Sequence, residues 1–322
     1  MRYLVTGGAG FIGSHLSEEL LRQGHDVLAL DDLSTGRYEN VAHLDDGARF
    51  RLVVDTVNNA EIVNECVKQA DAVFHLASAV GVRLIIDQPV RTIESIVMGT
   101  HETLKACARY RRPILITSTS EVYGKGVKTP FCEDDDRLLG ATSKRRWSYA
   151  CSKALDEFLA LAHWYETRLP VVITRLFNTV GPRQTGQYGM VAPAFVRQGL
   201  DGKPITVYGD GQQSRCFAHV KDVVEALVKL IDCRAARGEV VNLGNDEEVT
   251  ILGLAEMVRE MTGGKSKIVF ISYDEAYGEG FEDMRRRVPD LAKANRLIGY
   301  TPRRKLRKIL EDLVAYERAA RS

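Results

Sequence analysis

Two residues near the middle of the chain, Tyr149 and Lys153, have the types and the spacing of an acid–base pair. They lie four residues apart in Trp-Ser-Tyr-Ala-Cys-Ser-Lys, so a helix would place both side chains on one face. A neighbouring ammonium group favours the ionised form of a phenol, which allows a tyrosine to act as a base near neutral pH. Such a base can remove the proton of a hydroxyl group while a hydride leaves the carbon. The Tyr-x-x-x-Lys spacing is common by chance, so its meaning depends on the motifs around it.

The chain opens with a glycine-rich turn of the kind that holds a dinucleotide. Gly7, Gly10 and Gly13 follow an apolar strand pattern and begin a helical one. Glycines allow a tight turn there and let a pyrophosphate approach the helix N-terminus, where free N–H groups and the helix dipole favour anions. Asp31 ends the second strand pattern, where a carboxylate accepts hydrogen bonds from ribose hydroxyls and repels a 2′-phosphate. These residues predict NAD as the cofactor, in preference to NADP.

Three residues near this turn leave alternatives open. Asp32 could share or take the contact with the ribose, and Arg37 is a nearby cation that would favour a 2′-phosphate. Asp55 ends the third strand pattern, where it could reach the adenine or simply cap the end of the strand.

The elements that must position these residues alternate between strand and helix. Continuous apolar strands that alternate with helices predict a parallel sheet covered on both faces, with right-handed crossovers. We therefore expect an α/β fold, a Rossmann-like doubly wound sheet, in an NAD-binding domain over residues 1–177. The strand patterns are 3–6, 26–30, 50–54, 72–76, 113–117 and 171–176, and the helical patterns are 12–23, 60–68, 90–110 and 149–167.

The second half, 178–322, predicts a smaller α/β domain that binds the substrate, with part of 204–245 returning to the large sheet. The polar, glycine-bearing stretch 272–287 suggests a surface segment that wraps a ligand. No flexible linker separates the two parts, so the cleft between them is the expected ligand site. Helices are expected at 191–200, 221–231, 251–261 and 304–319, and strands at 205–208, 216–220 and 240–243.

Composition narrows the class of protein. The 44 basic and 43 acidic residues leave no global field that would attract nucleic acid or an anionic membrane. The six cysteines form no Cys-x-x-Cys pair and no cluster with histidine, so they predict reduced thiols, with no disulfide framework and no metal site. No apolar run approaches the ~18 residues of a membrane span. We expect a soluble, cytoplasmic protein.

Several segments together resemble the extended short-chain dehydrogenase/reductases that act on nucleotide sugars. The resemblance covers nearly the whole chain and implies an NAD-dependent enzyme that oxidises carbon 4 of a UDP-sugar. It also implies a homodimer, formed through the helices at 90–110 and 149–167. The segments that carry it are 7–13, 75–78, 118–124, Tyr149 with Lys153, 177–178, 181–183 and 205–217.

The same resemblance implies contacts with both ligands. Arg215 is expected at the diphosphate of the sugar nucleotide. The further cofactor contacts are Phe11, Ile12, Leu76 and Ala77, and the further substrate contacts are Asn178, Arg183, Val191 and Tyr277.

Three positions resemble the UDP-glucuronate decarboxylases in particular. Ser120-Glu121 stands where sugar 4,6-dehydratases typically carry Asp-Glu and 4-epimerases carry a non-acidic residue. The segments 146–149 and 277–283, the latter followed by Arg287-x-Pro289, resemble the aminoarabinose-pathway decarboxylase domain and UDP-apiose/xylose synthase. The arginine that corresponds to Arg287 lies at the sugar carboxylate in those enzymes. The segment 187–191 departs from both and looks more like UDP-xylose synthase or a generic epimerase.

These resemblances imply a separate role for each site residue of a UDP-glucuronate decarboxylase. Tyr149 removes the proton of the sugar 4-hydroxyl, Thr119 positions that oxygen, and Ser120 and Glu121 handle protons near carbon 5. Arg287 orients the carboxylate. The alternative is a UDP-glucose or UDP-uronate 4-epimerase, for which the run Arg-Arg-Val-Pro-Asp is also compatible. A more remote alternative is a non-catalytic regulator that senses a dinucleotide.

Four side chains also have plainer interpretations. Glu121 could be a solvated acid after a strand, and Arg287 a surface cation in an arginine run. His75 is better explained as a packed residue at a strand end than as a base, and Trp147 as a packing residue.

Overall fold

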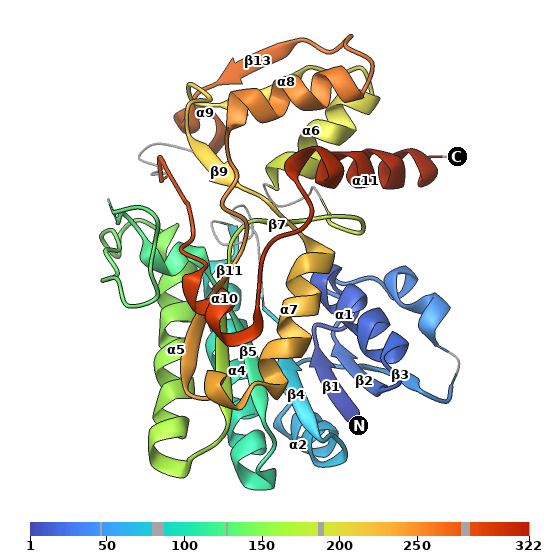
Figure 1. The fold of residues 1–322 in the computed structure, drawn as a ribbon, viewed down its shortest axis with the longest axis vertical. Helices are drawn as coiled ribbons and strands as arrows, with labels where there is room; N and C mark the ends of the chain where they lie inside the picture. The colour runs from blue at the N-terminus through green and yellow to red at the C-terminus, as the bar shows by residue number, and fades with distance from the viewer. Residues whose placement is uncertain (46, 79–86, 127, 186–189, 278–283, 322) are drawn as a thin grey trace.

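The structure, a computed structural model, describes residues 1–45, 47–78, 87–126, 128–185, 190–277 and 284–321. It has two lobes, one above the other in Figure 1: a large lobe around an extensive sheet, and a smaller lobe at the top. The N-terminus lies in the large lobe and the C-terminus in the small one.

The large lobe is built on a seven-stranded sheet in which all neighbouring strands are parallel. The strand order is β11-β6-β5-β4-β1-β2-β3. Because the order runs outward from β1 in both directions, the sheet is doubly wound, and the predicted fold class is confirmed. The strands are β1 (Arg2–Thr6), β2 (Asp26–Asp31), β3 (Phe50–Val54), β4 (Ala72–His75), β5 (Ile114–Thr119), β6 (Val171–Leu176) and β11 (Glu239–Leu243).

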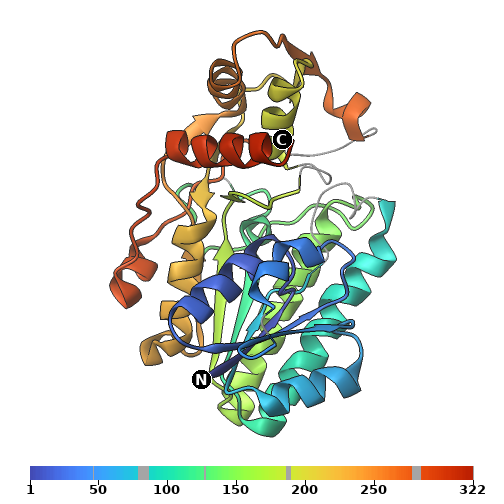
Figure 2. The ribbon, with the colours of Figure 1, turned by 90° about the vertical axis from the view of Figure 1, so that its right-hand side faces the viewer.

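Helices cover both faces of this sheet. The helices are α1 (Phe11–Arg22), α2 (Ala60–Gln69), α4 (Pro89–Tyr110), α5 (Trp147–Thr167) and α7 (Val220–Asp232). α1 and α7 pack on one face against Val5 and Phe74, whereas α2, α4 and α5 pack on the other against Leu4 and Val73. Successive strand residues point to opposite faces, so a continuous apolar strand fills two cores at once. Figure 2 shows the layers from the side.

The small lobe has an apolar core of its own, formed by three helices and a pair of short parallel strands, β8 and β13. β9 pairs with β12, and β7 with β10. α10 packs against β11 in the large lobe. The remaining strands are β7 (Thr179–Val180), β8 (Ile205–Tyr208), β9 (Ser214–Cys216), β10 (Ala218–His219), β12 (Glu248–Thr250) and β13 (Ile268–Ile271). The remaining helices are α6 (Val191–Leu200), α8 (Ile251–Met261), α9 (Tyr273–Tyr277), α10 (Ala292–Ile298) and α11 (Leu306–Ala319), with single turns η1 (Tyr38–Asn40), η2 (Ala42–Leu44), η3 (Ser120–Tyr123) and η4 (Arg234–Ala236).

The prediction of one strand over 216–220 was wrong. The chain forms β9 and β10 instead, and Val220 already begins α7. His219 sets this boundary, because its side chain accepts the N–H of Lys221 and caps the helix. β12, β13, α9 and α10 were not predicted from the sequence, because they are short and are held in place by tertiary contacts.

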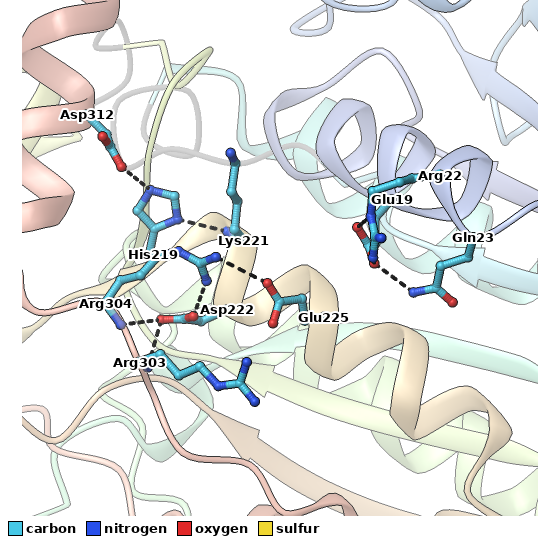
Figure 3. A network of polar contacts seen from close by, with 10 residues as sticks. All are labelled: Glu19, Arg22, Gln23, His219, Lys221, Asp222, Glu225, Arg303, Arg304 and Asp312. Carbon is cyan, nitrogen blue, oxygen red and sulfur yellow. Dashed lines mark hydrogen bonds and ion pairs between the residues drawn. The ribbon is translucent and has the colours of Figure 1, made fainter.

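A polar network ties the start of α11 to α7 (Figure 3). Asp222 of α7 accepts the backbone N–H groups of Arg303 and Arg304 at 3.1 and 3.0 Å, and it pairs with the Arg304 guanidinium. The ring of His219 lies 3.3 Å from Asp312 of α11. These contacts fasten the two lobes on the side of α7.

In the part of the chain that the structure describes, no helix is both long and apolar enough to cross a membrane. The same residues contain no group of three or more His, Cys, Asp or Glu that could hold a metal ion.

Candidate active site

A cleft of about 810 Å³ runs along the carboxyl ends of the large sheet and reaches into the small lobe. It is the place that a doubly wound sheet offers for a ligand. All predicted site residues except Tyr277 line it. Tyr277 ends α9, but its side chain lies outside the described residues, as do 186–189 and 278–283.

The glycine turn between β1 and α1 forms one end of the cleft. Gly7 has φ +70°, a conformation that favours glycine, and its N–H donates to Leu30 at 2.8 Å. A Cβ at Gly13 would collide with the carbonyl oxygen of Gly7. The turn therefore brings bare backbone to the N-terminus of α1, which is the surface that a pyrophosphate requires.

The tip of β2 supplies the predicted ribose carboxylate. Asp31 is buried and accepts the N–H groups of Ala9 and Leu33, each at 2.9 Å. Burial raises the pKa of Asp31, and these hydrogen bonds act against it. Asp31 thus supports the glycine turn as well as facing the cleft.

The neighbouring residues differ in position. Asp32 lines the cleft, and its Oδ1 accepts the N–H and hydroxyl of Ser34 at 2.9 and 2.5 Å. Asp55 also lines the cleft, and it accepts the N–H of Thr56 at 2.7 Å. Its position is therefore compatible both with contact to the adenine and with capping of the strand end. Arg37 is exposed and is not among the residues that line the cleft.

Tyr149 and Lys153 lie in the first turns of α5, and both are buried. Lys153 donates to Asp156 at 2.8 Å. Burial raises the pKa of Tyr149 above its usual range, and the charge of Glu121 raises it further. A hydrogen bond with Thr119 and the Arg287 guanidinium lower it. The phenol therefore depends on nearby donors and cations to become a base.

Thr119 to Glu121 lie where β5 ends and the single turn η3 begins. The Thr119 hydroxyl accepts the N–H of Glu121 at 3.2 Å and so caps η3. Ser120 is buried, and the side chain of Glu121 is only 15% exposed. Glu121 is thus not a solvated surface acid.

Arg287 comes from the far end of the sequence and meets these residues. Its Nη1 lies 3.4 Å from Ser120 Oγ and 3.6 Å from Glu121 Oε1, and the residue is 7% exposed. The adjacent backbone fixes this approach, because Phe131 N donates to Val288 O at 2.8 Å. Arg287 is therefore no surface cation.

The two preceding arginines are different. Arg285 and Arg286 are exposed and pair with Asp210 and Glu248, each at 2.8 to 2.9 Å. Only the third arginine of the run turns into the cleft.

The small lobe closes the other end. Arg215 is buried on β9, and Asn178 donates to the carbonyl oxygen of Cys216 at 3.2 Å. Val191 begins α6, so the N-terminus of that helix opens on the cleft. Arg183 has φ +67° and pairs with Glu18 at 2.5 Å.

Several residues that line the cleft were not predicted from the sequence. Arg146 had a usable signal, since it directly precedes the helix that carries Tyr149. Gln213 had another, since it lies two residues before Arg215, just ahead of β9, where an extended chain would point both side chains the same way. The additional residues with polar side chains include Gln88, Arg91, Arg146, Gln184, Gln198, Tyr208, Gln213 and Tyr273.

Comparison with known proteins gives this arrangement a family. Residues 4–313 match the family described as GDP-mannose 4,6 dehydratase. The chain belongs to this family. Within the GDP-mannose 4,6-dehydratase family, it is 41% identical to a UDP-N-acetyl-alpha-D-glucosaminuronate decarboxylase from Bacillus cytotoxicus, over 94% of this chain and 92% of the relative. It is 34% identical to UDP-glucuronic acid decarboxylase 1 from Xenopus tropicalis, over 98% of this chain and 72% of the relative.

A solved structure shares the fold of this family member closely. UDP-glucuronic acid 4-epimerase from Bacillus cereus, in complex with UDP-glucuronic acid and NAD, superimposes with a TM-score of 0.90. The two chains are 28% identical, and the match covers 99% of this chain and 100% of the epimerase. The predicted resemblance to extended short-chain dehydrogenase/reductases of nucleotide sugars is confirmed.

Proposed function

We propose that the protein is an NAD-dependent decarboxylase of a UDP-hexuronate. The observation that carries this proposal is the position of Arg287, which lies against Ser120 and Glu121 in the cleft that also holds Tyr149. Two relatives over nearly the whole chain are named as decarboxylases of UDP-linked uronic acids, which supports it.

A uronic acid needs a cation where its carboxylate enters the cleft. Removing a carboxylate from water is costly unless a charged partner meets it. The planar guanidinium of Arg287 can bind both carboxylate oxygens at once, which a lysine cannot do. Its contact with Glu121 Oε1 is long, at 3.6 Å.

The residues at the other end of the cleft fit NAD. The bare turn at Gly7 and Gly13 would hold the pyrophosphate, and Asp31 the adenosine ribose. Lys153, buried beside the cleft, is expected to meet the other ribose. When bound, NAD accepts a hydride from carbon 4 of the sugar.

The side chains of this chain supply the proton chemistry. Tyr149 removes the proton of the sugar 4-hydroxyl, and Thr119, which is hydrogen-bonded to Tyr149, positions that oxygen. The resulting 4-keto sugar has its carboxylate beta to a ketone, so carbon dioxide leaves as its electrons delocalise into an enolate. Ser120 and Glu121 then deliver a proton at carbon 5, and Arg287 orients the carboxylate until it is lost.

The second candidate is a 4-epimerase of the same substrates. The observation that favours it is the close similarity in fold to the Bacillus cereus UDP-glucuronic acid 4-epimerase. An epimerase shares the oxidation at carbon 4 but returns the hydride to the opposite face of the sugar. Its substrate is also a uronic acid, so Arg287 alone does not separate the two reactions. The acid at Glu121 favours decarboxylation, since epimerisation needs no proton at carbon 5.

The mass of the product tests the proposal. The protein would be incubated with NAD and, separately, with UDP-glucuronate, UDP-N-acetylglucosaminuronate and UDP-glucose. Loss of carbon dioxide from a uronate is the expected result. The uronate that is turned over faster identifies the preferred substituent at carbon 2. A product of unchanged mass but new chromatographic mobility would establish the epimerase instead. Absence of any turnover would favour a regulator that senses a dinucleotide.

We also propose how the chain is organised and assembled. Residues 1–177 bind NAD and 178–322 bind the nucleotide sugar, with β11 contributing to the large sheet. Two chains associate through α4 and α5, which expose apolar side chains. The six thiols suit a reducing compartment, the cytoplasm. The exposed apolar residues of the two helices are Val90, Ile93, Met98, Leu155, Phe158 and Tyr165.

A further inference from the structure

Behind Tyr149 and Lys153 lies a buried acid that the proposed reaction does not use. Asp156, one turn further along α5, accepts a hydrogen bond from Lys153 Nζ at 2.8 Å. The lysine side chain is 2% exposed and the aspartate side chain 1%, so this ion pair is shielded from water. Among the described residues, Asp156 is the one carboxylate in contact with the Lys153 ammonium.

A row of polar side chains lies behind Asp156. Burial raises the pKa of Asp156 and the Thr100 side chain of α4 acts against this, and the Thr100 hydroxyl oxygen lies 3.1 Å from Nε2 of His75 on β4. The other ring nitrogen of His75 lies 2.9 Å from the hydroxyl of Thr6 on β1. That hydroxyl accepts the N–H of Ala77 at 3.2 Å.

One assignment of protons satisfies the Thr6 hydroxyl and both ring nitrogens of His75. The Ala77 N–H can only donate, so the Thr6 hydroxyl accepts it and gives its own proton to Nδ1 of His75. Nε2 of His75 then carries a proton and donates to Thr100. His75 must be neutral for this pattern, and burial lowers the pKa of His75 to about 3, with the charge of Lys153 as a smaller cause.

We propose that Asp156 is a positioning residue: it is the fixed counter-ion that keeps Lys153 charged and aligned beside Tyr149. This inference rests on the proposed function only in taking Tyr149 and Lys153 as the reacting pair.

No other carboxylate in the described part of this region can replace Asp156 without giving up a partner. Glu157 of α5 is bound to Arg175 and Arg137, at 2.8 and 3.1 Å. Glu121 of η3 faces Arg287 across the cleft. The residue that α4 presents to Asp156 is the uncharged Thr100, and β4 presents the neutral His75. The charge balance of Lys153 therefore depends on one residue.

The charge of Asp156 has two opposite consequences for Tyr149. It favours the ammonium form of Lys153, and a nearby ammonium favours the phenolate. It also raises the pKa of Tyr149 directly, through the repulsion of two negative charges. Removing the charge of Asp156 would raise the pKa of Tyr149 through the first effect and lower it through the second. A substitution can therefore show which effect is larger.

Asp156→Asn keeps the shape and removes the charge. Without its counter-ion the buried Lys153 should lose its proton at lower pH. We expect the alkaline limb of the kcat/KM profile to move down by at least about one pH unit, and turnover at pH 8 to fall at least about tenfold. The proposal would be overturned if the alkaline limb did not move. It would also be overturned if only the acidic limb moved to lower pH and turnover rose.

Thr100 provides a matched pair of variants next to Asp156. Thr100→Val keeps the branched shape and removes the hydroxyl, whereas Thr100→Ser keeps the hydroxyl. Because the Thr100 side chain favours the charged form of Asp156, we expect Thr100→Val to move the alkaline limb in the same direction as Asp156→Asn, by a smaller amount, and Thr100→Ser to match the wild type. Equal profiles for the two variants would overturn the role of the Asp156 charge, and this comparison remains available if Asp156→Asn fails to fold.

A readout independent of turnover separates this inference from the proposed function. Nuclear magnetic resonance of protein labelled at the lysine side chains would follow the titration of Lys153, assigned with Lys153→Met. The Asp156→Asn variant should show a titration at lower pH than the wild type, whatever sugar the enzyme takes. An unchanged Lys153 titration would overturn the role of Asp156, whereas wild-type protein inert towards all three sugars would overturn only the proposed reaction.

Discussion

The role of Tyr149 as a base can be tested by removing its phenolic oxygen alone. The ring is buried, and its pKa is governed by burial, by Glu121 and by the opposing effects of Thr119 and Arg287. We expect Tyr149→Phe to lower turnover by at least ~10²-fold, the usual loss when a general base is removed. NAD binding, measured by calorimetry, should remain close to that of the wild type, because the glycine turn is untouched. Near wild-type turnover would remove Tyr149 as the base.

Arg287 is the residue whose substitution distinguishes a uronate enzyme from one for neutral sugars. Removing one side of a buried charge pair typically costs ~2–5 kcal/mol, so Arg287→Met should lower turnover of the preferred UDP-uronate by at least tens of fold. Any activity on UDP-glucose should change little. Arg286→Met is the matched control, because that neighbouring arginine is exposed and bound to Glu248. Equal loss on charged and neutral sugars would make Arg287 a structural or diphosphate contact.

Asp31 and Asp32 can be separated by paired substitutions. Asp31 also accepts the N–H groups of Ala9 and Leu33, so asparagine is a gentler change than alanine. We expect Asp31→Asn to narrow the preference for NAD over NADP, because the repulsion of a 2′-phosphate is lost. Binding of both dinucleotides would be measured by calorimetry. If Asp32→Asn narrows the preference instead, the ribose contact belongs to Asp32.

At the scale of the elements, the cap of α7 is expected to make stability depend on pH. Burial, with a smaller effect of the Arg304 charge, lowers the pKa of His219 to about 4. Between about pH 6.5 and 4 the unfolded chain binds a proton at this position that the folded chain does not. The free energy of unfolding should therefore fall with falling pH over this range, by at most about 1.4 kcal/mol per pH unit from this residue.

His219→Asn tests that expectation in urea unfolding at several pH values. Asparagine can accept the N–H of Lys221 and still cap the helix, but it does not titrate. The variant should show a flatter dependence between pH 6.5 and 4 and a similar stability near pH 7. Parallel curves for the two proteins would show that His219 titrates normally in the folded state.

At the scale of the whole molecule, the exposed apolar side chains of α4 and α5 predict a dimer. Leu155 of α5 is 51% exposed, and burying it against a second chain would remove apolar area from water. We expect a dimer mass by light scattering at micromolar concentration, and a monomer for Leu155→Glu. Phe270→Glu, on β13 of the small lobe and 56% exposed, is the control and should leave the mass unchanged. A monomeric wild type would contradict the assembly.

The doubly wound parallel sheet was predictable from the sequence because the patterns that indicate it are local. Apolar runs such as 26–30 and 171–176 are continuous, so both faces of each strand had to be covered, and the helices between them allow only parallel crossovers. The glycine turn and Asp31 follow from the same logic, since the ends of adjacent parallel strands meet at one edge. The boundary at 216–220 was missed because a side-chain cap, His219, decides it.

The sequence by itself determined the doubly wound sheet, the glycine turn and the types of residue in the site, because periodicity and spacing along the chain fix them. The resemblance pointed to Arg287 among three consecutive arginines, but the physical reason that this one enters the cleft lies in the tertiary structure. Arg287 reaches Ser120 and Glu121 because the backbone beside it pairs with Phe131, while Arg285 and Arg286 remain at the surface. The tertiary structure likewise buried Asp156 with Lys153 and placed Thr100 against His75, since contacts between a helix, its neighbour and a strand depend on packing across the chain.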